Sequence, residues 1–296
     1  MDESSWGTQS WQEDHFPQDQ LDSKGDAWGI RWRGVEKWRH RLYVKAIRKS
    51  LRREQPVAVL DIGCALCDFT QKAWRLNRDN KFWGLDTSER AIAWNSQEFP
   101  MFEFKVATLP EIPFDTKFDV VFCLEVLCYL DSEGRRASIR NIHDSLTPGG
   151  VLMFSGVLDG GNRHHTKEEV LDLLAPDFEV QKIVYHHWWL HRGFEEILNR
   201  IDFAATSLAG KIKMPADEFR DWCAERSGGA QTALIKLLRI ARPVSAWPLA
   251  WLSLLIKFLL GRESLAILGD GISKLFWSED KAGEIVVLAR KKQQKE

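Results

Sequence analysis

Between residues 57 and 157 the sequence alternates short apolar runs with segments of helical periodicity, and this alternation restricts the fold more than any other feature. The apolar runs predict strands at 57–62, 82–85, 102–107, 118–123 and 151–157. The segments between them predict helices that end near residue 76, run over 88–97, and run over 132–146. Strands that alternate with helices form a parallel sheet that is covered on both faces. We therefore expect a doubly wound α/β fold.

Turn and cap signals extend this pattern in both directions. A basic segment with helical periodicity over 26–53 ends before Pro56. Pro148-Gly149-Gly150 predicts a turn before the fifth strand. Thr166, followed three residues later by Glu169, predicts a capping box at the start of a further helix. The last strands are expected at 179–188 and 284–288, with mostly helical residues between them.

Three parts of the chain follow from this arrangement. Residues 1–25 are polar and acidic without periodicity, and we expect a flexible tail there. Residues 26–190 together with 281–296 are expected to form the α/β domain. Residues 191–280 are expected to be a helical insertion before the last strand, which acts as a cap, a dimer contact or a membrane-surface element.

Charge and cysteine content exclude several classes of protein. The 41 basic and 42 acidic side chains nearly cancel, which gives no reason to expect nucleic acid as a partner. Five cysteines in a long chain, after an acidic start without an apolar leader, predict a reducing compartment, so we expect a cytoplasmic protein. The charge-free run over 243–256 is shorter than the roughly 20 residues that a membrane-spanning helix requires.

The end of the first predicted strand carries the clearest site signal. Ligands of doubly wound sheets bind at the carboxyl ends of the strands. Here Asp61 and Gly63 precede Cys64 and Ala65, where the chain must turn tightly. The segment lacks the three-glycine pattern of nicotinamide-binding proteins, so a nicotinamide cofactor is disfavoured.

Five segments in the expected order resemble the class I S-adenosylmethionine-dependent methyltransferases. They are VLDIGCALCDFT, KFWGLDTSERAI, FKVATLPEIPF, FDVVFCLEVLCYL and LTPGGVLMFSG. The resemblance implies a mostly parallel, seven-stranded Rossmann-like methyltransferase sheet and S-adenosylmethionine as cofactor. It also implies that Asp86 accepts both ribose hydroxyls, for which a carboxylate is a natural partner. The matching cofactor positions are Asp61, Gly63, Cys64, Ala65, Asp86, Thr87, Ala107, Thr108, Cys123 and Leu124.

Within that family, the opening GDAWGIRWRGVEKWRHR and the run LEVLCYL look closest to the nodulation N-methyltransferase group. The sequence departs from the family where many members have glycine, at Ala65 and Cys67. The side chain of Cys67 is expected where the loop passes the methionine part of the cofactor. An inactive relative that has lost the cofactor is the alternative that this departure leaves open.

The cysteines allow a second interpretation of the same region. Cys64 and Cys67 have a spacing typical of redox or metal sites, and the ends of the first and fourth strands would bring Cys123 and Cys128 near them. A metal would occupy the volume that the resemblance gives to the cofactor, and cysteine is also a common small buried residue. We therefore expect no metal and assign these cysteines to packing.

Catalytic candidates come from the loops after the fourth and fifth strands. Methyl transfer from a sulfonium requires a positioned acceptor and, for a nitrogen or oxygen nucleophile, removal of a proton. Glu125 and Tyr129 lie one turn apart and can orient an amine or hydroxyl. Glu125 can equally serve only to hold a backbone amide or the ammonium group of the cofactor. His164 and His165 follow the fifth strand, and His165 is our candidate base, although a histidine before a capping threonine is more often structural.

The insertion has a distinctive charge pattern. Every charged residue over 227–262 is basic, namely Lys236, Arg239, Arg242, Lys257 and Arg262, and tryptophans lie among them. This pattern suits peripheral contact with an anionic membrane surface, which would place the protein at the inner face of a membrane. A cap over the site or a homodimer contact is the alternative interpretation.

Together these features predict transfer of a methyl group from S-adenosylmethionine to a nitrogen or oxygen atom of a small-molecule acceptor, such as a saccharide or lipid-linked precursor. The competing hypothesis is a non-catalytic protein that keeps the fold as a binding or membrane-associated scaffold.

Overall fold

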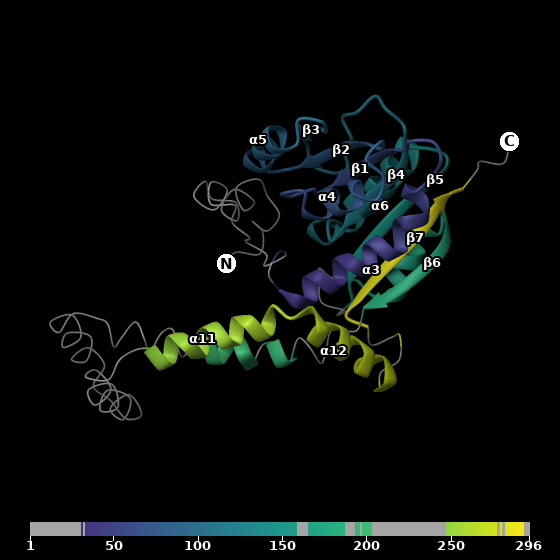
Figure 1. Ribbon diagram of the computed structural model, residues 1–296. Helices are drawn as coiled ribbons and strands as arrows, with labels where there is room; N and C mark the ends of the chain where they lie inside the picture. Colours follow the sequence, from purple (N-terminus) through teal and green to yellow (C-terminus); the bar gives the residue numbers. More distant parts are fainter. Residues whose placement is uncertain are drawn as a thin grey trace, which may run out of the picture.

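Seven strands form one sheet in the order β3-β2-β1-β4-β5-β7-β6 (Figure 1). The computed structural model describes residues 31, 33–158, 165–186, 193–195, 197–202, 247–276, 279 and 282–292. The strands are β1 (Ala58–Ile62), β2 (Lys81–Asp86), β3 (Glu103–Val106), β4 (Phe118–Leu124), β5 (Leu146–Val157), β6 (Phe178–His186) and β7 (Glu284–Lys291). All pairs among the first five strands are parallel, and β7 is antiparallel to both β5 and β6. The expected doubly wound, mostly parallel seven-stranded sheet is therefore confirmed.

Helices cover both faces of this sheet because its strands are apolar on both sides. On one face, α3 (Gly34–Leu51) and α4 (Asp68–Trp74) pack against side chains such as Val59, Val120 and Met153. On the other face, α6 (Ser132–Ser145) and α7 (Lys167–Leu174) pack against alternate residues such as Leu60 and Leu152. Successive side chains along each strand therefore alternate between two separate hydrophobic cores, one on each face of the sheet.

Helix starts follow the cap signals in the sequence. The hydroxyl of Ser88 accepts a hydrogen bond from Ala91 N at the start of α5 (Glu89–Glu98), and Asp131 caps α6. At α7 the Thr166 hydroxyl accepts from Glu169 N, and Glu169 accepts in return from Thr166 N. The predicted capping box is confirmed.

The predicted turn at Pro148-Gly149-Gly150 differs from the structure, because these residues lie within β5. The pairing with β4 jumps from Leu146 opposite Phe118 to Val151 opposite Val120, so the extra residues leave the ladder as an irregularity. Gly149 has a φ of 75°, which glycine adopts without strain. The strand therefore begins earlier than its apolar run.

Helices occupy the described part of the chain between β6 and β7, where the insertion was expected. They are α11 (Trp247–Leu260), α12 (Glu263–Phe276) and the helical residues among 193–202. A Cβ added to Gly34 at the start of α3 would lie 2.4 Å from Arg262 O, so α3 directly contacts the turn between α11 and α12. Trp38 Nε1 also donates to Asp270 Oδ2 over 3.0 Å. The expected tail over 1–25 lies outside the described residues.

Within the described residues, none of the helices combines the length and the hydropathy that crossing a bilayer requires.

Candidate active site

The loop after β1 makes a tight turn. It lies where the strand order reverses, because β2 and β3 are added on one side of β1, and β4 and β5 on the other. Gly63, Ala65 and Cys67 have positive φ values of 70°, 44° and 58°. A Cβ at Gly63 would lie 2.5 Å from Val126 Cγ2, so the loop passes close to the segment after β4. Ala65 and Cys67 hold a left-handed conformation without being glycine, which costs about 1–2 kcal/mol per residue. The loop keeps the shape of a glycine-rich turn although two of the glycines are absent.

Hydrogen bonds from β2 and α5 hold this loop. Asp86 Oδ2 accepts from Ala65 N over 2.9 Å, and Asp86 Oδ1 accepts from Ser88 N over 3.0 Å. The side-chain amide of Asn95 donates to Ala65 O over 2.7 Å. Each carboxylate oxygen has two lone pairs and can accept from more than one donor. The chemistry of Asp86 fits a pair of vicinal hydroxyls.

Asp61 is a second carboxyl group at this edge of the sheet, with 4% of its surface exposed. Its oxygen accepts a hydrogen bond from the Thr70 hydroxyl. Burial and, to a smaller extent, the charge of Asp86 raise the pKa of Asp61, the hydrogen bond from Thr70 lowers it, and the net value is about 7. A cation bound between Asp61 and Asp86 would be stabilised by both groups.

The cysteines of the loop point into the protein. Cys67 is 0% exposed, and its side chain packs with Cys64 and Ile92. Hydrogen bonding to Cys67 and burial raise the pKa of the Cys64 thiol well above its usual range. The Cys67 side chain therefore packs within the protein, away from the ligand-facing position expected from the sequence.

The described cysteines Cys64, Cys67, Cys123 and Cys128 are all free thiols. In the part of the chain that the structure describes, no group of three or more histidine, cysteine or acidic residues is placed to hold a metal ion.

Glu125 immediately follows β4, with a φ of 59° and a partly exposed side chain. Ser155 Oγ on β5 donates to Glu125 Oε1 over 3.0 Å. Burial and the neighbouring charge of Glu284 raise the pKa of Glu125 to about 8, against the opposing effects of Arg39 and Ser155. Glu125 is therefore poised to exchange a proton near neutral pH.

A buried polar network that the sequence analysis missed lies behind Glu125. The Tyr43 hydroxyl lies 2.9 Å from Ser155 Oγ and donates to Glu284 Oε1. His186 Nδ1 lies 3.1 Å from Glu284 Oε2. Burial alone would raise the pKa of Glu284, but the hydrogen bond to His186 and the charge of Arg39 hold it below its usual value. The available sequence signal was Glu284, an acidic residue at the start of β7 directly before the apolar run over 285–289.

Other residues expected at the cofactor site line the same edge. Thr87 is partly exposed beside Asp86, and Ala107 N donates to Asp86 O over 3.0 Å. Thr108 is exposed next to it. At the end of β4, Cys123 is buried in the core and Leu124 is partly exposed.

The other two catalytic candidates have different surroundings. Tyr129 ends a short 3₁₀ helix, Leu127–Tyr129, and burial together with the charges of Cys128 and Glu125 raises its pKa. Its hydroxyl thus remains a proton donor beside Glu125. His165 is buried, with its Nδ1 3.4 Å from Arg135 Nη1 and its ring edge-on to Phe154. Its catalytic role remains a prediction, and its packing is that of a structural histidine.

Comparisons with known proteins extend over this site. Residues 60–152 match the family model described as a methyltransferase domain. None of the curated proteins compared with the sequence matches it significantly.

Several solved structures are similar to the chain. The N-methyltransferase NodS from Bradyrhizobium japonicum WM9, in complex with S-adenosyl-l-homocysteine, is 25% identical, with 57% of this chain and 89% of that chain covered and a TM-score of 0.48. A TehB-like SAM-dependent methyltransferase from Corynebacterium glutamicum is 18% identical, with 56% and 80% covered and a TM-score of 0.41. The MccD protein is 14% identical, with 88% and 100% covered and a TM-score of 0.47.

The segment that matches the family model runs from β1 into β5 and includes the loop over 63–67, Asp86 and Glu125. Its sheet has the strand arrangement that the family resemblance predicts. Residues 60–152 therefore carry a methyltransferase domain, as the resemblance to the class I S-adenosylmethionine-dependent methyltransferases predicts, and the chain is an enzyme.

Proposed function

We propose that this enzyme transfers a methyl group from S-adenosylmethionine to a nitrogen or oxygen atom of a small-molecule acceptor, with a saccharide or a lipid-linked precursor as the favoured class. The observation that carries the proposal is Glu125, a partly exposed carboxyl group at the carboxyl edge of the sheet with a pKa of about 8. Nitrogen and oxygen nucleophiles lose a proton when they are methylated, so they require such a group nearby.

The loop over 63–67 and Asp86 would hold the cofactor. The two carboxylate oxygens of Asp86 suit the ribose hydroxyls, and backbone atoms at Gly63 and Ala65 line the approach. Ala107 and Thr108 would lie along the adenine, because they follow β3 next to Asp86. When bound, the cofactor supplies a methyl group that its positively charged sulfur already activates.

Asp61 would balance the positive charge of the cofactor. Its pKa of about 7 reflects burial and the nearby charge of Asp86, and a bound cation would favour its ionised form. Binding of a cationic cofactor should therefore release a proton near neutral pH.

Glu125 and Tyr129 would act on the acceptor. Glu125 accepts the proton that the nucleophile loses, while Ser155 fixes the carboxyl group through its hydrogen bond. The Tyr129 hydroxyl can orient a polar group of the acceptor, because its raised pKa keeps it protonated. His165 is not needed in this scheme.

We also propose a cytoplasmic location at the inner face of a membrane. The basic segment expected to contact the membrane spans 227–262, and residues 227–246 of it lie outside the described residues. Exposed apolar side chains on α11 support the membrane contact. A homodimer contact remains the competing proposal.

The test is formation of S-adenosylhomocysteine from S-adenosylmethionine with a panel of amino sugars, hydroxylated sugars and lipid-linked acceptors. The methylated atom is identified by mass spectrometry. Glu125→Gln should lower kcat by about 10²–10⁴-fold. The control Glu111→Gln, at an exposed glutamate, should leave kcat unchanged. A methyl group found on carbon or sulfur, or full activity of Glu125→Gln, would contradict the proposal.

A further inference from the structure

Large apolar side chains are exposed mainly on the helices between β6 and β7. Outside these helices, the exposed large apolar residues among the described ones are only Met101 and Val106. We call the exposed apolar residues on these helices the insertion surface. They are Phe194, Ile197, Ile201, Trp251, Leu252, Leu254, Leu255, Phe258, Ile267, Leu268, Leu275 and Phe276.

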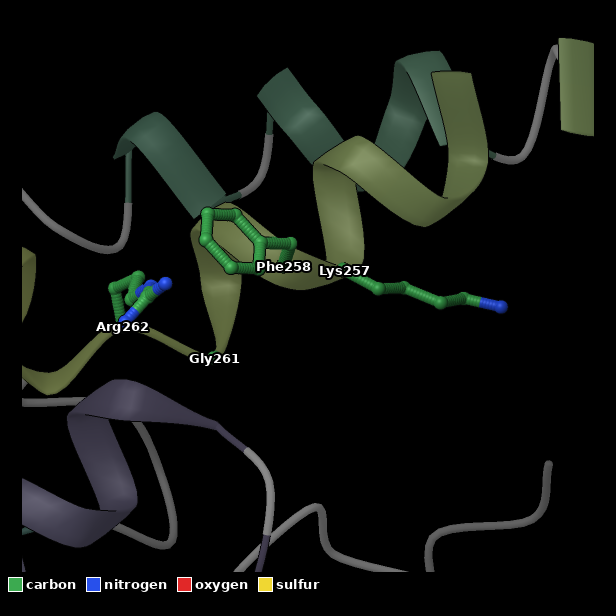
Figure 2. A pocket seen from close by; sticks show the side chains of 4 residues that line it. All are labelled: Lys257, Phe258, Gly261 and Arg262. Atoms are coloured by element: carbon green, nitrogen blue, oxygen red, sulfur yellow. The ribbon is translucent and has the colours of Figure 1, made fainter. Parts of the chain in front are cut away.

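The concentration of these residues is unusual for a monomer. Scattered exposed apolar residues are normal, but a group of this kind marks an interaction site. On α11 the residues Ser253, Ile256 and Leu260 form the buried stripe, while Trp251, Leu254 and others around the rest of the helix are exposed. Figures 1 and 2 both place the helical residues near 193–202 beside α11, so the two segments that carry these exposed residues lie next to each other.

Charge is segregated on α11 and α12. The acidic side chains of the two helices are Glu263 and Asp270, and both are turned toward α3. Glu263 Oε1 pairs with Arg41 Nε over 2.7 Å, and the buried Asp270 accepts from Trp38. α11 itself carries no acidic residue.

Basic groups remain on the outside. Lys257 and Arg262 are exposed at the end of α11, where they line a shallow pocket with Phe258 and Gly261 (Figure 2). Figure 2 shows the Lys257 side chain extending away from the helix, and the Arg262 guanidinium lies 3.9 Å from the centre of the Phe258 ring. The exposed surface of α11 is therefore apolar and positively charged.

The segment over 31–34 connects the helices of the insertion surface to the loop over 63–67 of the active site. Arg31 Nε pairs with Asp68 Oδ1 over 2.8 Å, directly after the loop over 63–67. Three residues further on, Gly34 contacts the turn between α11 and α12. A hydrophobic acceptor held at the insertion surface would thus lie on the side from which the site is approached.

We infer that the insertion surface docks on an anionic lipid bilayer, with α11 in the plane of the interface. Its apolar side chains would enter the acyl boundary, and Lys257 and Arg262 would contact anionic headgroups. A 14-residue helix spans about 21 Å, shorter than the roughly 30 Å of the hydrocarbon core, so α11 lies on the membrane rather than across it. A two-fold contact with a second copy would set Lys257 and Arg262 against an equally basic surface, which disfavours that occupant.

The inference does not depend on the proposed acceptor, and its test does not use activity. The full chain is floated with vesicles of phosphatidylcholine alone and with vesicles that contain equal parts of phosphatidylcholine and phosphatidylglycerol. We expect flotation with the anionic vesicles and about fivefold less with the neutral ones, since each basic residue near the surface favours anionic lipid. The Leu254→Glu/Leu255→Glu variant should lose flotation by about tenfold or more, because charged groups would enter the apolar boundary.

Matched controls separate docking from misfolding. The side chain of Met101 is 57% exposed, which is close to the 59% of Leu254, but Met101 is not part of the insertion surface. The Met101→Glu variant should therefore float like wild type. Lys257→Ala/Arg262→Ala should lower flotation on anionic vesicles and leave the small neutral fraction unchanged. Each variant is checked for S-adenosylmethionine binding, which should stay at the wild-type level.

Two results would overturn the inference. The first is wild-type protein that is monodisperse and binds cofactor but floats with neither vesicle. The second is a stable dimer in light scattering that Leu254→Glu/Leu255→Glu converts to monomer, without flotation of either form. Because cofactor binding is measured separately, neither result bears on the proposed methyl transfer.

Discussion

The raised pKa of Glu125 makes part of the pH dependence of the protein's stability traceable to this residue. Glu125 has a pKa of about 8 in the folded protein, against 4.5 ordinarily. Between these values the unfolded chain loses the proton while the folded protein keeps it. Raising the pH through this range therefore lowers the free energy of unfolding, and the effect is complete above about pH 8.

The size of this effect follows from the two pKa values. At about 1.4 kcal/mol for each tenfold change in proton affinity, the upper limit is about 5 kcal/mol. Glu125 is partly exposed, so water screens part of its interaction with Glu284, and we expect about 1–3 kcal/mol.

Glu125→Gln isolates this contribution. Glutamine keeps the shape and the oxygen that accepts from Ser155 Oγ, but it does not ionise. Urea unfolding followed by tryptophan fluorescence at pH 5 and pH 9 gives the free-energy difference between the variant and wild type. That difference should shift in favour of Glu125→Gln by about 1–3 kcal/mol between pH 5 and pH 9. An identical difference at both pH values would refute the assigned pKa and the role built on it.

Three further changes test the surroundings of the site by urea unfolding. Tyr43→Phe leaves the buried Glu284 with one donor fewer and should cost about 1–3 kcal/mol, and a cost near zero would contradict the buried network. Gly63→Ala should lower the free energy of unfolding by at least about 1 kcal/mol, because the new side chain would have a positive φ and would clash with Val126. Adding Val126→Ala should restore part of that loss, whereas purely additive losses would argue against the close approach. Thr166→Ala removes the capping box of α7 and should cost about 1 kcal/mol, while the nearby exposed Glu168→Ala should cost little; equal effects would contradict the cap.

Local patterns predicted the parts of the structure that depend on neighbouring residues. The strand-helix alternation gave the sheet, and the Thr166-Glu169 pair gave the start of α7. The positions of Asp61 and Asp86 at the ends of β1 and β2 followed from the same pattern. Each of these signals lies within a few residues of the feature that it predicts.

Contacts between distant parts of the chain were beyond this kind of inference. The network behind Glu125 joins Tyr43 on α3 to Glu284 on β7, and no periodicity relates positions so far apart. The inward direction of Cys67 also depends on packing against α5, which the loop sequence alone does not reveal. The start of β5 was misplaced because proline and glycine usually mark turns, whereas here they form an irregularity within a strand.

Calorimetric titration with S-adenosylmethionine and S-adenosylhomocysteine tests the central claim most directly. Wild-type protein should bind both, with dissociation constants of about the micromolar range. Asp86→Ala should weaken binding by about 5–150-fold, equivalent to about 1–3 kcal/mol, with its fold verified by circular dichroism. Asp79→Ala, at an exposed aspartate outside the site, should bind like wild type. Absence of binding by wild-type protein, or unchanged affinity in folded Asp86→Ala, would contradict the account of the site.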